Sequence, residues 1–150
     1  LQQRLKIDTR MPDDIIIVSE AEKSDAFAAV DLALACSGTV ITELATTGVP
    51  TVAAYRLGWI TWALIRMLNV MKSPYTTLVN MASDSNLVLE HVQTRCTAGR
   101  LAASTQGLLD SPERRQQISQ ALRQATDEMR GEGKASDRAA EVVLQYLPAN

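Results

Sequence analysis

Short apolar runs alternate with helix-like segments in the first half of the chain. Helices are expected over residues 24–30, capped by Ser24 and Asp25, and over residues 40–47, where Gly48 stands at the C-terminal end. The runs before, between and after these helices are typical of buried strands: Ile15–Val18, Leu32–Ala35 and Thr51–Tyr55. This alternation, with tight connections, predicts a parallel sheet with crossover helices.

Helical patterns dominate the second half. Helices are predicted over residues 57–72, 86–93, about 99–109, from Ser111-Pro112 to Gly131 and from Ser136 onward, with a short strand at Tyr75–Leu78. The two last helices have these apolar inner faces: Ile118, Leu122, Ala125 and Met129, then Ala139, Val143, Tyr146 and Leu147. The fold class is therefore α/β, a Rossmann-like parallel sheet flanked by helices, with a helical C-terminal layer. Because Leu1–Arg10 supply neither a first strand nor a glycine-rich turn, we expect the chain to begin inside the fold.

The amino-acid composition argues against several classes of function. The 150 residues are 46% apolar and 21% charged, which fits one globular domain. A net charge of −2, with two Trp, three Tyr and one Phe, provides neither the basic field nor the stacking surface of a nucleic-acid-binding protein. One His and two Cys, Cys36 and Cys96, are too few for an ordinary zinc site, so no metal is expected, and the thiols fit a reducing cytoplasm. The most apolar stretch, Leu57–Met71, is shorter than the about 20 residues that a membrane span needs.

Candidate chemistry centres on Ser37-Gly38-Thr39, between a predicted strand and a helix. Free N–H groups at such a helix start attract phosphate, and Gly38 would let a ligand approach the backbone. A purely structural helix cap is the alternative. Glu43 lies one turn further on the same face, where its carboxylate could bind a ligand's hydroxyls or pair with Arg56.

The segment Ala35–Arg56, ACSGTVITELATTGVPTVAAYR, resembles the donor-binding half of lipid-A-disaccharide synthases. The resemblance continues through a Trp-containing helix to Pro74-Tyr75, Leu78-x-Asn80, Glu90, Gln93 and Cys96, and covers about residues 15–147. It implies a glycosyltransferase of the GT-B arrangement, with two Rossmann-like domains. Such an enzyme transfers 2,3-diacylglucosamine from UDP to lipid X with inversion and without a cofactor. Residues 1–150 would be the C-terminal, nucleotide-sugar-binding domain, truncated at its start and lacking the acceptor domain.

The same resemblance implies roles for single residues. Ser37, Gly38 and Thr39 would face the diphosphate of the UDP-sugar, and Glu43 its ribose. The remaining donor-binding positions would be Tyr55 and Arg56 at one strand end and Asn80 and Glu90 on the other wall. The lipid X acceptor would be bound through the missing domain, and no residue of this chain is a good candidate for the catalytic base. His91, at a position that is ordinarily apolar in the family, is not expected to be catalytic.

One segment departs from the family pattern. Where the family usually has Leu-Pro-Asn-x-x-x-Gly-Arg-Glu, the last three positions here are Asp84, Ser85 and Asn86. Loss of a cation beside a phosphate would weaken binding by about 1.5–3 kcal/mol if that Arg makes a charged hydrogen bond. This departure and the missing first unit predict that the chain alone has no transferase activity. The alternatives are another UDP-sugar transferase or epimerase, and a non-catalytic remnant or interaction module of the same fold.

The predicted helix over Leu57–Lys72 carries more apolar surface than one sheet face can cover. Trp62 and Ile65 fall within its polar arc, so we expect at least one large apolar side chain to be exposed. Other helices could cover it. The functional alternative is a contact of Trp59, Trp62 and Ile65 with acyl chains, a missing domain or the inner face of the inner membrane, as for a peripheral membrane protein. Incomplete Rossmann halves could also complete one another in a homodimer.

Overall fold

The computed structural model describes residues 15–36, 38–67, 73–131 and 135–146, and the chain divides into two compact units, Leu1–Val30 and Asp31–Asn150. In the first unit, the 3-10 helix η1 (Glu20–Glu22) leads directly into α2 (Lys23–Ala29). Ser19 begins this helical segment, because its main-chain N and its hydroxyl both donate to the Glu22 carboxylate, at 3.0 and 2.6 Å. These hydrogen bonds hold the pKa of Glu22 below its usual value. The helix expected over residues 24–30 is confirmed as α2, but Ser24 and Asp25 lie inside it and do not cap it.

The strand predicted at Ile15–Val18 is wrong. These residues belong to no helix or strand, and Ile16 is 86% exposed. An isolated β-branched run gains strand geometry only when a neighbouring strand supplies hydrogen-bond partners. Within the described residues, every strand pairing lies in the second unit.

The second unit is built on a three-stranded parallel sheet in the order β1 (Ala33–Ala35), β2 (Thr51–Tyr55) and β3 (Leu89–Val92). The parallel sheet and two of its strands are confirmed. The third strand, β3, replaces the helix that was predicted over residues 86–93. Its register on β2, from Val52↔Leu89 to Tyr55↔Val92, decides its structure, since a run this short is ambiguous by periodicity alone.

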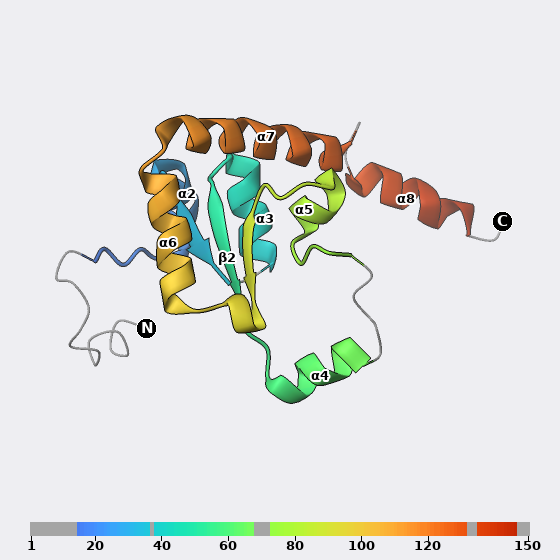
Figure 1. The fold of residues 1–150 in the computed structure, drawn as a ribbon. Coiled ribbons are helices and arrows are strands. Elements are labelled where there is room, and N and C mark those ends of the chain that lie inside the picture. Colours follow the sequence, from blue (N-terminus) through green and yellow to red (C-terminus); the bar gives the residue numbers. More distant parts are fainter. Residues whose placement is uncertain (1–14, 37, 68–72, 132–134, 147–150) are drawn as a thin grey trace. The chain divides into compact units, whose positions relative to one another are not determined.

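Helices cover the sheet on two sides. Figure 1 shows α3 (Gly38–Thr47) and α5 (Leu78–Ser83) on one side and α6 (Ala98–Leu109) on the other, with α7 (Pro112–Arg130) crossing the ends of all three. The core between the sheet and α3, α5 and α7 consists of side chains at most 6% exposed: Ile41, Ala45, Ala53, Val79, Val88, Leu122 and Ala125. The fold class predicted from the sequence is confirmed.

The segment between β1 and β2 ends as predicted, and the segment between β2 and β3 differs from prediction. Gly48 ends α3 as expected, with φ +76° and a hydrogen bond from its N–H to the Ala45 carbonyl at 2.9 Å. The helix predicted over 57–72 is α4 (Trp59–Met67), and residues 68–72 lie outside the described part. Tyr75–Leu78 is not a strand. Leu78 begins α5, where the Thr77 side chain accepts a hydrogen bond from the Asn80 N–H.

The C-terminal helical layer is only partly packed. Leu122 and Ala125 of α7 are buried as predicted and Ile118 is half-buried, but Met129 is 39% exposed. The last helix, α8 (Ala135–Gln145), has no inner face of the kind predicted. Its Ala139 is exposed, Val143 is 60% exposed, and Tyr146 just beyond it is 84% exposed. Leu147 lies outside the described residues.

Candidate functional site

The carboxyl ends of the three strands lie at one edge of the sheet because the strands are parallel. At this edge β1 continues into Cys36, and α3 begins at Gly38. Gly38 and Thr39 are both exposed at the start of that helix, while Ser37 lies outside the described residues. The phosphate-facing position expected for Gly38 and Thr39 is therefore open to a ligand, at the edge where open α/β sheets bind ligands.

Tyr55, the last residue of β2, lies close to the start of α3. A side-chain carbon added to Gly38 would lie 3.7 Å from the Tyr55 hydroxyl, so the phenol reaches the start of α3. Burial raises the pKa of Tyr55, and the nearby Glu90 and Cys36 raise it further. The phenol is thus a neutral hydrogen-bonding group at neutral pH. Arg56, the next residue, is exposed.

Glu90, which is half-buried, and Asn80, which is buried, form a hydrogen-bonded network near this edge. The two carboxylate oxygens of Glu90 accept from the Thr76 and Thr77 N–H groups, at 2.7 and 2.9 Å, and from the Thr77 hydroxyl at 2.7 Å. Asn80 is fully buried and donates to Glu90 at 2.8 Å; its amide also bonds both main-chain groups of Val88. The structure therefore brings these two predicted residues together, with their polar atoms directed at each other and at the backbone.

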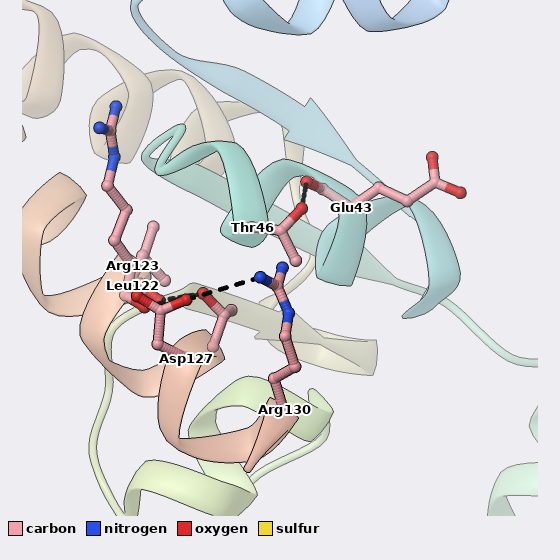
Figure 2. A network of polar contacts seen from close by, with 7 residues as sticks. Glu43, Thr46, Leu122, Arg123, Asp127 and Arg130 are labelled. Atoms are coloured by element: carbon pink, nitrogen blue, oxygen red, sulfur yellow. Dashed lines mark hydrogen bonds and ion pairs between the residues drawn. The ribbon is translucent and has the colours of Figure 1, made fainter. Parts of the chain in front are cut away.

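Glu43 is half-buried on α3, one turn beyond Thr39. Figure 2 shows its carboxylate directed away from the exposed Asp127–Arg130 ion pair, whose charged atoms are 3.9 Å apart. The main-chain carbonyl of Glu43 accepts a hydrogen bond from the Thr46 hydroxyl at 2.7 Å, a contact within the helix.

The segment that departs from the family pattern has a local structural explanation. Asp84 has φ 45° and ψ 37°, the left-handed region that glycine favours and that Asp adopts more readily than most other residues. It ends α5, and the Ser85 hydroxyl donates to the Ser83 hydroxyl at 2.8 Å. Asn86 is exposed, 3.5 Å from the Asn80 amide. Asp84 thus preserves the turn, while no cation stands at position 85.

Helix α4 exposes a different set of apolar residues from the one expected. Trp59 is 78% exposed as predicted, but Trp62 and Ile65 are half-buried. The exposed apolar positions share one face of α4 by their spacing: Trp59, Ile60, Ala63, Leu64 and Met67. The exposed apolar face of α4 therefore includes Trp59, as expected, but not Trp62 or Ile65.

No role was predicted for Gln93 from the sequence, although it is polar and next to the site. Its side chain joins β3 to the chain that leaves β2: Gln93 Oε1 accepts from the Leu57 N–H at 2.6 Å, and Nε2 donates to the Leu57 carbonyl at 3.1 Å. His91 lies on β3 rather than on the predicted helix, and its Nε2 is 2.8 Å from the Ser104 hydroxyl of α6. Gln93 is one of the residues that carry the family resemblance, but its contact with Leu57 could not be predicted, because the two residues are 36 positions apart.

In the part of the chain that the structure describes, no three His, Cys, Asp or Glu side chains are grouped so as to hold a metal ion. No described helix is both long and apolar enough to cross a bilayer.

The fold and the polar edge define a class of protein: an α/β, Rossmann-like partial domain, with glycine, a carboxylate and a phenol near the carboxyl ends of parallel strands. The family model of lipid-A-disaccharide synthetase matches residues 3–145. The chain therefore belongs to the lipid-A-disaccharide synthetase family, a family of glycosyltransferases in lipid A biosynthesis.

Single relatives support this assignment. A lipid-A-disaccharide synthase from Rhodospirillum centenum is 42% identical over 134 residues, which cover 89% of this chain and 33% of that protein. Those from Nitrobacter winogradskyi and Gloeothece citriformis are 37% and 35% identical, over 88% and 87% of this chain. The chain spans about one third of the length of these relatives.

Proposed function

We propose that this chain is the donor-binding part of a lipid-A-disaccharide synthase and binds the UDP moiety of UDP-2,3-diacylglucosamine at the carboxyl edge of its sheet. The observation that carries the proposal is the meeting of the Gly38 helix start with the Tyr55 hydroxyl, beside the family's Ser-Gly-Thr and Glu positions. In the whole protein, the sugar would be transferred to lipid X with inversion and UDP would leave.

The donor would be held by groups of three kinds. The N–H groups at the start of α3, with Ser37 and Thr39, would bind the diphosphate, which the positive end of a helix favours. The carboxylate of Glu43 would accept hydrogen bonds from the ribose hydroxyls. Arg56 would add positive charge, which stabilises the departing UDP as negative charge develops on it.

Asn80 and Glu90 would form the other wall indirectly. Since their polar atoms already bond one another, Val88 and the Thr76–Thr77 backbone, they would hold that wall in place. The catalytic base would come from sequence outside this chain, and the chain alone would transfer no sugar.

We place the whole protein at the inner face of the cytoplasmic membrane, as a peripheral protein. The exposed apolar face of α4 supports this, because Trp59 and Met67 are 78% and 74% exposed. Between Glu43 and Asp84 the sequence has no acidic residue and three basic ones, Arg56, Arg66 and Lys72, which suits an anionic lipid surface. A homodimer in which incomplete halves complete each other is a further proposal for this chain.

Calorimetric titration of UDP into the folded chain tests the donor site. We expect saturable binding that Glu43→Ala weakens at least about tenfold, since a charged hydrogen bond to a ligand is worth about 1.5–3 kcal/mol. Glu128→Ala is the matched control, because Glu128 is an exposed carboxylate on α7 that accepts a hydrogen bond from Gln124 of the same helix. Circular dichroism establishes that each variant is folded.

Two results would speak against the proposal. Equal UDP affinity in the Glu43→Ala variant would move the ribose site elsewhere. A folded chain, and a folded full-length protein, that bind no UDP would favour the non-catalytic remnant, to which the loss of the cation at Ser85 already points. Binding of other UDP-sugars in preference to the diacylated one would favour the transferase or epimerase alternative.

A further inference from the structure

Gln93 stands where β3 leaves the sheet. The main-chain ladder between β2 and β3 ends at Tyr55↔Val92, and Gln93 then turns away with φ +50°. Its side-chain amide continues the pairing, because Oε1 accepts from the Leu57 N–H at 2.6 Å and Nε2 donates to the Leu57 carbonyl at 3.1 Å. A primary amide presents one acceptor and one donor, as a peptide group does, so it can replace the missing strand partner.

The other end of the same connection is also bonded to β3. Glu90, three residues before Gln93, accepts from the Thr76 and Thr77 N–H groups at 2.7 and 2.9 Å. The chain therefore leaves β2 and reaches α5 with hydrogen bonds to two side chains, that of Gln93 just after β3 and that of Glu90 in β3. Neither end can shift without breaking one of these hydrogen bonds.

A purely local role explains Gln93 poorly. A left-handed turn by itself is best served by glycine, and asparagine is among the few other residues that adopt it readily, while Gln pays a conformational penalty there. Both bonds to Leu57 are exposed to solvent, where a hydrogen bond contributes little to stability. What a Gln side chain adds at this position is its reach to the Leu57 backbone.

We infer that Gln93 is a positioning residue for the nucleotide donor. By holding Leu57, it fixes the two preceding residues, Tyr55 and Arg56, at the carboxyl edge of the sheet, where Gly38 also lies. The Tyr55 hydroxyl then stays beside the start of α3 and Arg56 stays at the mouth of the site. This inference rests on the proposed donor site and adds a residue to it that touches no part of the ligand.

The test compares variants of the full-length protein that contains this chain. Gln93→Gly removes the side chain and suits the positive φ, so its thermal midpoint should stay near that of the parent. Its UDP dissociation constant should rise about fivefold or more, because a misplaced binding group loses part of its interaction. The donor KM should rise with it, while kcat changes less than about twofold. Hydrogen exchange at the Leu57 amide should accelerate, since its acceptor is gone.

Two further variants complete the series. Gln93→Glu keeps the acceptor for the Leu57 N–H and loses the donor to the carbonyl, so it should weaken UDP binding by an intermediate factor. Gln106→Ala is the control, because Gln106 makes a similar exposed side-chain bond, to Asp110 at 2.7 Å, within α6. It should leave UDP affinity unchanged.

Each outcome decides the inference. Unchanged UDP affinity in Gln93→Gly despite faster exchange at Leu57, or unchanged UDP affinity in Gln93→Glu, overturns it. Unchanged exchange at Leu57 in Gln93→Gly overturns it as well, because the bond would then be absent in solution. If Glu43→Ala weakens UDP binding and the Gln93 variants do not, the donor site stands and only the role of Gln93 fails. If none of these variants affects UDP binding, the proposed donor site itself is wrong.

Discussion

Helices α3 and α4 are both rich in apolar residues and both follow a strand of the sheet, yet only one of them contributes to the core. In α3, Ile41, Leu44 and Ala45 are at most 2% exposed. In α4, none of the side chains that the structure describes is buried, and Ile60 is 63% exposed. Apolar content alone therefore does not distinguish a core helix from a surface helix in this chain.

Connectivity explains the difference. The α3 helix connects β1 to β2, two directly paired parallel strands, so the crossover lays it on the sheet, where α7 covers it. Between β2 and β3 the described residues form the helices α4 and α5. It is α5, with the fully buried Val79 and Asn80, that packs on the sheet. The sheet therefore does not cover the apolar face of α4. This is the face that we propose contacts lipid.

The largest expected effect comes from the same substitution in both helices. Ile41→Ala should destabilise the protein by about 2–5 kcal/mol, because Ile41 is 1% exposed and its removal leaves a cavity. Ile60→Ala should stay within about 0.5 kcal/mol of the parent, as expected for an exposed position. Urea unfolding followed by circular dichroism measures both. Equal destabilisation by the two variants would mean that α4 is packed in solution, and the contrast between the helices would be lost.

A smaller effect is expected from the glycines that flank the two helices. Gly48 ends α3 with φ +76°, and an added side-chain carbon would lie 2.9 Å from Ser119 Oγ and closer still to Arg123 Nε. Gly48→Ala should therefore cost about 1–2 kcal/mol, mostly through the left-handed backbone, since the flexible Arg123 can move. Gly58 precedes α4, and a carbon added there would be 3.9 Å from Thr61 Oγ1. Thermal unfolding of Gly58→Ala should match the parent, and a loss as large as that of Gly48→Ala would contradict this account.

The smallest effect concerns Tyr55, which lies between the two helices at the end of β2. Its pKa in the folded protein is raised above the usual 10.0 by burial and by Glu90. The unfolded chain would thus lose this proton first, so the contribution of Tyr55 to stability is complete below pH 10 and declines as the pH rises from about 10 through the folded pKa. Tyrosinate absorbance should show one late-titrating group that Tyr55→Phe removes. Tyr146→Phe, at an 84% exposed position, should leave that late phase intact. If Tyr146→Phe removed the late phase and Tyr55→Phe did not, the late-titrating group would not be Tyr55.

Much of the architecture could be predicted from local pattern. The β2 strand, the Gly48 stop, the Pro112 helix start and the Gly131 stop were placed correctly because each depends on residues close in the chain. The failures were runs whose structure depends on a distant partner. Residues 89–92 became a strand through pairing with β2, and Ile15–Val18 did not, since within the described residues nothing pairs with it.

The residues of the candidate site also differ in whether they depend on neighbours in the sequence or on distant partners. Ser37-Gly38-Thr39 and Glu43 could be proposed as site residues because a predicted strand and a predicted helix follow each other directly in the sequence. The bonds of Asn80 and Glu90 to each other, and the bond of Gln93 to Leu57, span 10 and 36 positions of the chain. Periodicity carries no information about such pairs.

The sequence by itself determined the family and the parallel α/β class, because these follow from local residue order. Only the tertiary structure decided which apolar helix is buried, which polar residues bond the backbone and where Tyr55 lies. Those outcomes depend on how strands pair and which surfaces compete for the sheet, and the free energy of burial and of hydrogen bonding is set by neighbours in space.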